Sequence, residues 1–163
     1  MKKEVSRNRW SRFCKQFSAT NQFRRMTVSV ASRKGRATIT SEQRPFLGVM
    51  IQKKDRKIDR IQFFAGRGAA EAVSEPVFEI QQPSRFVIER DQDGLDTRLM
   101  VESADGARAE LELAGSGREE GYQALVKDVA YSIFQQRGNH GKDLDNWLTA
   151  EKIIQDTSTA FTR

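Results

Sequence analysis

The sequence predicts an α+β fold: an antiparallel β meander that forms a curved sheet or a small barrel, with an N-terminal amphipathic helix and a C-terminal helical hairpin. Near the N-terminus, apolar residues recur at the spacing of a helix. From about residue 23 to residue 113 they alternate with polar residues, which is typical of half-buried strands. After a Gly- and Ser-containing joint the helical spacing returns. We therefore expect a helix plus β domain over residues 1–114 and a helical hairpin over residues 115–163.

The N-terminal helix is predicted from one apolar stripe. Its members lie at positions i, i+3, i+4 and i+7 of a helix: Trp10, Phe13, Cys14 and Phe17. The polar residues from Met1 onward lead into this helix, and Ser6 or Asn8 is placed to cap it. Three basic side chains project away from the stripe toward solvent: Arg9, Arg12 and Lys15.

The central region is predicted to form seven strands. They cover about residues 23–31, 36–40, 46–52, 58–64, 77–90 with a break at Pro83, 98–103 and 107–113. The connections are short and carry Gly, Asp and Lys, which is typical of hairpin turns. Loops this short favour an antiparallel meander over a parallel sheet. The sequence leaves open whether the strands form a curved sheet or close into a small barrel.

The C-terminal region is predicted to form two helices. The apolar residues of the first helix recur at helical spacing: Tyr122, Leu125, Val126, Val129, Ile133 and Phe134. Gly138 is placed to end that helix in a left-handed backbone conformation, and Asp143 is placed to cap the next helix. The second helix carries an apolar face made of Leu144, Trp147, Leu148 and Ile154.

This predicted hairpin resembles an uncharacterised family of bacterial domains over about residues 121–155. The matching positions are Arg137, Gly138, Gly141, Asp143, Leu144, Trp147, Leu148, Ala150 and Glu151. Asn146 departs from the acidic residue that is usual before the Trp of the family. The resemblance implies no activity, so we interpret these residues as structural, with a recognition site as the alternative. We expect Trp147 and Leu148 to pack onto the first helix, Ala150 to permit close helix approach, and Glu151 to pair with Arg137.

Residues from about Trp10 to Ala114 are similar to a second uncharacterised bacterial family. The shared features are Trp10 and Phe17 on the first helix, Pro45 followed by Leu47 and Gly48, Pro83 before a strand, and the segment Glu102-Ser103-Ala104-Asp105-Gly106. A His that belongs to the pattern of that family is replaced by Phe78 in this chain. The resemblance therefore supplies neither a catalytic group nor a substrate or cofactor.

The 163-residue chain has a net charge of +6, which conceals a strong asymmetry. Residues 1–67 contain 18 Lys and Arg against 4 Asp and Glu, whereas residues 68–163 contain 10 against 18. A basic half of this kind is typical of a site for nucleic acid, another polyanion or an acidic partner. The alternative is that the two halves face each other, within one molecule or across an oligomer, and neutralise each other.

Ten basic residues are candidates for polyanion binding, on the first helix and in two predicted turns. They are Arg9, Arg12, Lys15, Arg33, Lys34, Arg36, Lys53, Lys54, Arg56 and Lys57. If the strands run up and down in order, the two basic turns and an acidic turn with Asp91, Asp93 and Asp96 all lie at one end of the sheet. Basic turns without aromatic side chains suit phosphates but lack the stacking platforms that single strands favour.

The sequence assigns no catalytic residue, metal site or cofactor. His140 is the single His, and Cys14 lies on an apolar stripe, where a thiol is buried and unreactive. Structural zinc needs three or four Cys or His ligands, and this chain has two in total. The acidic turn around Gly94 lacks the closing Glu of a calcium loop. Gly66-Arg67-Gly68 lacks the third glycine and the Lys-Ser/Thr ending of a phosphate-binding loop.

These observations favour a soluble, non-enzymatic binding or adaptor module that acts through protein–protein contacts, with a protein partner or a second copy of the chain. One alternative is sequence-independent binding of nucleic acid or another polyanion through residues 1–67. The other is an enzyme with a carboxylate-centred site that the spacing does not identify. No run of about 18 apolar residues is present to span a bilayer, so we expect no membrane partner and a cytoplasmic location. No small-molecule substrate is identified.

Overall fold

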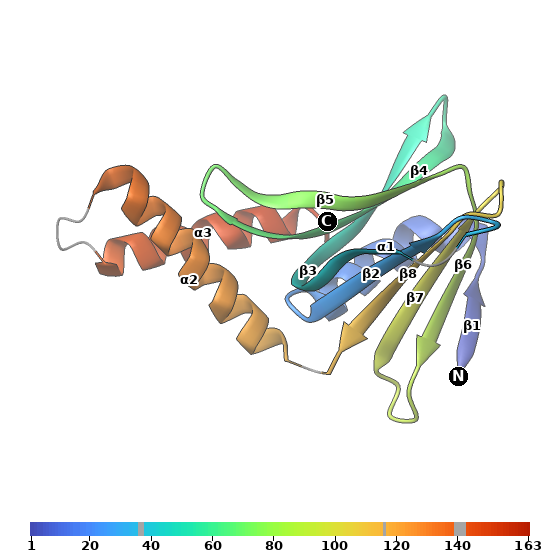
Figure 1. The fold of residues 1–163 in the computed structure, drawn as a ribbon, viewed down its shortest axis with the longest axis horizontal. Helices are drawn as coiled ribbons and strands as arrows, with labels where there is room; N and C mark the ends of the chain where they lie inside the picture. Colours follow the sequence, from blue (N-terminus) through green and yellow to red (C-terminus); the bar gives the residue numbers. More distant parts are fainter. Residues whose placement is uncertain (36–37, 116, 139–142) are drawn as a thin grey trace.

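The structure, a computed structural model, describes residues 1–35, 38–115, 117–138 and 143–163, and within these ranges the side chains of all residues except 40–42. The elements in chain order are β1 (Lys2–Val5), a 3₁₀-helix η1 (Arg7–Arg9), α1 (Trp10–Asn21), β2 (Arg25–Ala31), β3 (Thr38–Lys54), β4 (Lys57–Ala69), β5 (Ala72–Gln81), β6 (Pro83–Arg90), β7 (Asp96–Ser103), β8 (Arg108–Ala114), α2 (Arg118–Arg137) and α3 (Asp143–Thr159). This is the α+β fold expected from the sequence, with α2 and α3 forming a hairpin beside the sheet (Figure 1).

The eight strands of the described residues form one antiparallel sheet in the order β1-β6-β7-β8-β2-β3-β4-β5. The sheet is open, with edges at β1 and β5, so the curved sheet is the correct alternative and the closed barrel is not. The strands form two meanders, β2-β3-β4-β5 and β6-β7-β8, which are joined through the pairing of β8 with β2, so β5 is not paired with β6. Gln82 has a φ of 48° between these strands, and Pro83 has no N–H to donate, so the chain turns a corner there. The predicted break at Pro83 is thereby confirmed.

The strand β3 corrects the prediction of two separate strands at 36–40 and 46–52. Its first half pairs with β2 as far as Pro45, and its second half pairs with β4 from Phe46 onward. The pairing with β2 contains register shifts next to Val28, and Gln43 has a φ of 55°. A proline is tolerated at such an irregular point, where the strand changes partners, so Pro45 does not end the strand.

The residues before α1 also differ from the prediction. Lys2–Val5 form the strand β1, which pairs with β6, and Arg7–Arg9 form a 3₁₀-turn, so the polar N-terminal stretch is not the start of the helix. The helix α1 begins at Trp10, and neither Ser6 nor Asn8 caps it with a side-chain hydrogen bond. A four-residue strand with charged side chains carries no periodicity long enough to be recognised in the sequence.

The predicted apolar stripe of α1 is confirmed, because it packs against one face of the sheet. Trp10, Cys14 and Phe17 are buried, and Phe13 is half-buried beside them. The Trp10 ring meets Phe86 of β6 edge to face, with ring centroids 4.7 Å apart, and its indole N–H donates to the main-chain oxygen of Val5 at 2.9 Å. The stripe therefore ties α1 to both β1 and β6.

Cys14 lies in this core as an apolar group. Burial of its side chain raises the pKa of the thiol from 9.0 to about 12, because the thiolate would lose its hydration there. At neutral pH the side chain is therefore a thiol, which is a poor nucleophile. The prediction that Cys14 is a core residue is confirmed by its burial.

The hairpin packs on β3, β4 and β5 through a second core. This core includes Leu125 and Val129 of α2, Ile154 of α3, and Leu47 and Phe161 from outside the two helices. Among the residues that the structure describes, no helix has the length and apolar character of a membrane span.

The apolar face expected for α3 is correct for Trp147 and Ile154 and wrong for Leu144 and Leu148. Leu144 and Leu148 are 70% and 54% exposed, whereas Asn146, Ala150 and Ile154 are buried. The buried residues are spaced by four positions and form one stripe toward α2 and the sheet. Leu144 and Leu148 lie on a different side of the helix from this stripe, and their side chains remain on the surface of the hairpin.

A buried arginine joins the end of α1, the start of β7 and the segment that leads to the hairpin. The Arg24 side chain is 1% exposed, and its Nε donates to the main-chain oxygen of Gly115 at 2.6 Å. Its Nη1 donates to Asn21 Oδ1 at 2.7 Å and to the main-chain oxygen of Asp96 at 2.8 Å. Burial lowers the pKa of Arg24, and the carboxylates of Asp96 and Asp91 oppose that shift.

A candidate anion-binding pocket

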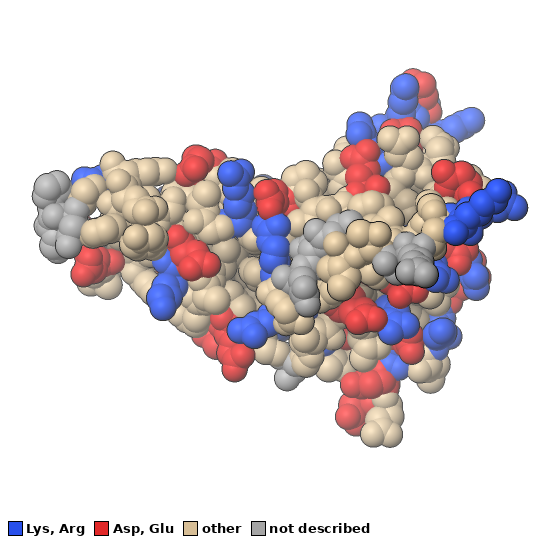
Figure 2. Space-filling view, in the orientation of Figure 1, with Lys and Arg blue, Asp and Glu red and all other residues tan. Residues whose placement is uncertain are grey.

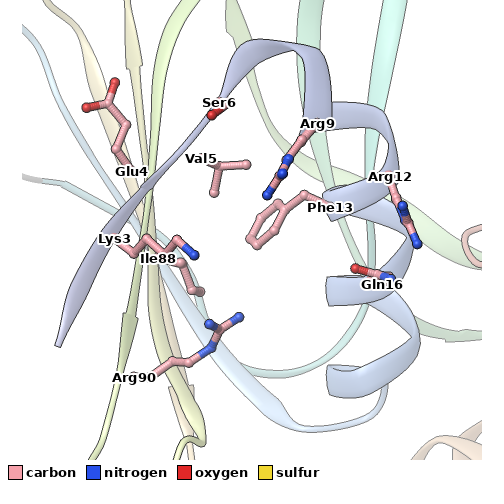
Figure 3. Close-up of a pocket in the computed structure, with 10 residues that line it drawn as sticks. All are labelled: Lys3, Glu4, Val5, Ser6, Arg9, Arg12, Phe13, Gln16, Ile88 and Arg90. Atoms are coloured by element: carbon pink, nitrogen blue, oxygen red, sulfur yellow. The ribbon is translucent and has the colours of Figure 1, made fainter.

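A cavity of about 370 Å³ lies between β1, the start of α1 and β6 (Figure 3). It is lined by Lys3, Glu4, Val5, Ser6, Arg9, Arg12, Phe13, Gln16, Ile88 and Arg90. Four of these ten residues are cationic and one is acidic. The cavity therefore gathers four basic side chains around one hollow.

The strand β1 forms one wall of the cavity, because its side chains point alternately to the two faces of the sheet. In the antiparallel pairing of β1 with β6, Lys3 lies opposite Ile88 and Val5 lies opposite Phe86. Successive side chains of a strand point to opposite faces, so Lys3 and Val5 face α1 while Glu4 faces away. The 3₁₀-turn then returns the chain over the cavity, where Arg9 points inward from the other wall (Figure 3).

Few carboxylates neutralise the basic side chains of the cavity. Among the described residues, no carboxylate lies within ion-pair distance of Lys3, Arg9 or Arg12. The acidic residue of the lining, Glu4, points away from the hollow and pairs with Arg85 at 3.4 Å (Figure 3). Like charges held together without a counter-ion repel one another, and an anion in the cavity would relieve that repulsion.

Arg90 supplies the fourth cation from the end of β6. Its Nε donates to Asp96 Oδ1 at 2.7 Å, which fixes the guanidinium, and its side chain extends toward the cavity (Figure 3). Because one N–H of the fork is used on Asp96, other N–H groups stay available to a ligand. Asp96 in turn accepts from Asn21 Nδ2 at 2.8 Å, which links this wall to the buried network of Arg24.

The floor of the cavity is apolar. The Phe13 ring faces the hollow, together with Val5 and Ile88 (Figure 3). Phe13 is held from behind by Phe17 and Phe86, with ring centroids 5.6 and 6.1 Å away. The site therefore combines a basic rim with an aromatic surface.

The structure separates the ten polyanion candidates into three places. Arg9 and Arg12 line the cavity, and Lys15 follows on the exposed side of α1, next to an apolar crevice that also touches Arg163. Arg33 and Lys34 lie in the turn between β2 and β3, while Arg36 falls outside the described residues. The remaining four lie at the turn between β3 and β4: Lys53, Lys54, Arg56 and Lys57.

The two basic turns are not neighbours, contrary to the prediction. They lie at opposite ends of β3, because that strand is continuous where two strands were expected. The acidic turn between β6 and β7 lies at the end of the sheet where β2 begins, away from Arg33. The acidic residue that does lie beside Arg33 and Lys34 is Asp105, in the turn between β7 and β8.

Charges on the outer face of the sheet, turned away from α1, are largely neutralised by ion pairs between neighbouring strands and within one strand. Arg98 pairs with Glu112 at 2.8 Å, and Arg108 lies 3.5 Å from Glu110. On this face Lys and Arg are interspersed with Asp and Glu (Figure 2). The partners in these pairs all belong to residues 68–163.

Ion pairs between the basic and acidic halves are few. In the part of the chain that the structure describes, they join Arg44 to Glu75, Arg60 to Glu79, and Arg85 to Glu4. The acidic half therefore neutralises mainly its own arginines. Within one molecule, this arrangement argues against the alternative in which the two halves cancel each other.

The segment Gly66-Arg67-Gly68 has a structural explanation. A Cβ at Gly66 would lie 3.0 Å from Leu125 Cδ1, and one at Gly68 would lie 2.8 Å from Asp128 Cβ, so these glycines let α2 approach β4. In the described residues, no group of three or more His, Cys, Asp or Glu is arranged to hold a metal ion.

The structure places most of the motif residues of the hairpin. Gly138 ends α2 with a φ of 73°, a conformation that favours glycine, and α3 begins at Asp143. Ala150 is buried, but Glu151 accepts a hydrogen bond from the Tyr122 hydroxyl at 3.1 Å instead of pairing with Arg137. Trp147 is half-buried in the second core, as expected. Gly141 and His140 fall outside the described residues.

The cavity also includes three residues that were not among the polyanion candidates: Lys3, Phe13 and Arg90. Lys3 lies in a strand that was not predicted, and Arg90 lies far from it in the sequence. Phe13 was recognised as a core residue, yet its ring also faces the hollow. The one signal in the sequence is the density of Lys and Arg from residue 2 to residue 15.

Residues 122–156 match a family model described as "Protein of unknown function (DUF2934)". This range covers α2 from Tyr122 onward and most of α3, and it confirms the resemblance of the hairpin to an uncharacterised family. No curated protein and no solved structure matches the chain. The resemblance of residues 10–114 to a second family stays a prediction.

Proposed function

We propose that the protein is a non-enzymatic binding module whose basic cavity holds a polyanion. The observation that carries the proposal is that Lys3, Arg9 and Arg12, which have no ion-pair partner among the described residues, all line one hollow. Arg90 adds donors from the opposite wall. Phosphate and sulfate groups have several acceptor oxygens, so two or three such cations can bind one group together.

A polymer fits this surface better than a single small anion. Arg9 at the end of η1 and Arg12 on α1 are exposed, and Lys15 is exposed further along α1. Arg163 lies against the neighbouring crevice beside Lys15. Repeated anionic groups of one chain can therefore bind the cavity and the helix at the same time, which raises affinity without further contacts in the cavity.

The double substitution of Arg9→Gln and Arg12→Gln is expected to weaken heparin binding at least about 10-fold at low salt, since it removes two of the four cations of the cavity. Heparin is the probe because it presents repeated anionic groups without nucleobases. Isothermal titration calorimetry of the full chain measures the affinity. The matched control is Lys53→Gln with Lys54→Gln, which removes the same charge from the turn between β3 and β4.

The control variant is expected to bind within about 3-fold of the wild type, because its turn is remote from the cavity. Equal weakening by both double variants would show that net charge alone attracts the polyanion, and it would contradict a site in the cavity. Thermal unfolding of both variants verifies that the fold is retained.

A second candidate function, an adaptor that binds proteins, is favoured by the exposed leucines of the hairpin. Leu144 and Leu148 lie one turn apart on α3 and leave an apolar stripe on the surface. We propose a second copy of the chain as the partner on this stripe. Light scattering is expected to show a dimer that dissociates on Leu144→Ser with Leu148→Ser, whereas a monomeric wild type would contradict this candidate.

A further inference from the structure

We propose that the polyanion is a single-stranded nucleic acid, with one base lying against the Phe13 ring while its flanking phosphates bind Lys3, Arg9 and Arg12. This inference rests on the proposed binding of polyanions by the cavity and identifies the class of polyanion. The observation behind it is that the cations do not lie on a flat surface. They surround an apolar floor, which a ligand made only of anionic groups would leave uncovered.

The aromatic floor is rigid. Phe13 is anchored by Phe17 and Phe86, and the edge-to-face contact of Trp10 with Phe86 supports the same cluster. A ring that is fixed in advance loses little conformational entropy when a base stacks on it. Stacking on one aromatic side chain contributes a substantial part of the affinity of single-strand-binding proteins and accepts every base.

The size and shape of the cavity select a single strand. The volume of about 370 Å³ is in the range of cavities that hold small ligands, so one nucleotide fits. A duplex keeps its bases paired inside and presents phosphates outward, so it would contact the rim and leave Phe13 bare. In a single strand the bases are free to turn out onto an aromatic side chain.

The polar groups of the lining fit binding without sequence preference. Apart from the charged residues, the cavity offers the Gln16 amide and the Ser6 hydroxyl among the described residues. Two such groups cannot specify one base among four in the way that a set of edge-reading side chains does. An acidic peptide is the less suitable ligand, because its carboxylates lie on flexible side chains without a flat ring beside each charge.

The test is fluorescence anisotropy of the full chain with four labelled probes at low salt. They are a ten-nucleotide oligo(dT), an abasic ten-mer with the same number of phosphates, a ten-base-pair duplex, and a poly-glutamate peptide of equal charge. We expect the oligo(dT) to bind about 5- to 100-fold more tightly than the abasic strand, because only the former can stack on Phe13. The duplex and the peptide are expected to bind no better than the abasic strand.

The substitution Phe13→Leu keeps an apolar side chain against the core and removes the ring. It is expected to weaken oligo(dT) binding about 5- to 100-fold and to leave binding of the abasic strand unchanged. The matched control is Phe134→Leu, because Phe134 is a half-buried aromatic residue on α2, far from the cavity, and it stacks on Tyr131. This control is expected to change neither affinity.

Equal binding of oligo(dT) and the abasic strand by the wild-type chain would overturn the inference, whether or not the Phe13 variant folds. In that outcome the cavity remains a polyanion site. Preferential binding of the duplex or of poly-glutamate would likewise overturn it. If neither heparin nor any of the four probes binds, the proposed function itself falls.

Discussion

Substitution of the buried arginine, Arg24→Ala, is expected to lower the free energy of unfolding by roughly 3–5 kcal/mol. The guanidinium donates to the main-chain oxygens of Gly115 and Asp96 and to Asn21 Oδ1, and all three acceptors would lose this partner. Each unsatisfied buried acceptor costs about 1–3 kcal/mol, and the removed side chain leaves a cavity as well. Because Gly115 begins the connection to the hairpin, we also expect this connection to loosen.

Urea unfolding followed by circular dichroism measures the effect of this substitution. The matched control is Arg25→Ala, since Arg25 is the next residue along the chain and its side chain is exposed. Its loss is expected to change the unfolding free energy by less than about 0.5 kcal/mol. If Arg24→Ala were as mild as the control, the buried network would not be a fixed junction between the sheet and the hairpin.

Substitution of Gly121→Ala is expected to destabilise the protein by about 3 kcal/mol, because the first turns of α2 touch the backbone of the segment before β2. A Cβ at Gly121 would lie 1.7 Å from the main-chain oxygen of Phe23. Neither atom belongs to a flexible side chain, so the helix as a whole must move away. The gain in helix propensity from Gly to Ala, about 1 kcal/mol, does not compensate for this displacement.

The displaced helix would also separate Tyr122 from Phe23, whose rings now lie 5.1 Å apart. A changed near-ultraviolet circular dichroism spectrum together with a lower unfolding midpoint is the expected result. Gly117→Ala serves as the control, because Gly117 is exposed and a Cβ there would meet nothing closer than 3.6 Å. A Gly121→Ala variant with wild-type stability would show that α2 is not docked as closely as described.

The elements that the sequence predicts well are those whose signal is local. The stripe on α1 follows from the spacing of Trp10, Cys14 and Phe17, and the structure buries all three. The break at Pro83 follows from the missing N–H of proline. These features depend on the nearest turn or the nearest residues of the strand, so no knowledge of the sheet order is needed.

The errors arise where long-range packing overrides a local signal. Pro45 suggests the end of a strand, but β3 changes partners there and continues. Leu144 and Leu148 look like core residues by hydrophobicity, but docking of the hairpin on β3–β5 buries the stripe that contains Asn146. The sheet order depends on the pairing of β8 with β2, which no local pattern encodes, and the separation of the two basic turns depends on the continuity of β3.

Only part of the candidate site could be predicted from the sequence. Arg9 and Arg12 stood out through the basic character of the first 67 residues, since charge density can be read without a structure. The hollow itself could not be predicted, because Lys3 and Arg90 meet only through the pairing of β1 with β6. Phe13 faces the hollow for the same reason, so the sequence could not show an aromatic surface beside the basic residues.

The central claim, that the cavity binds a polyanion through its four cations, is tested most directly by the salt dependence of oligo(dT) binding. Four contacts to a single strand predict a slope of log affinity against log salt of about −3, since each contributes about 0.7. The variant with Arg9→Gln and Arg12→Gln should show a slope of about −1.5. A slope that both proteins share, or the absence of binding at low salt, would contradict the account.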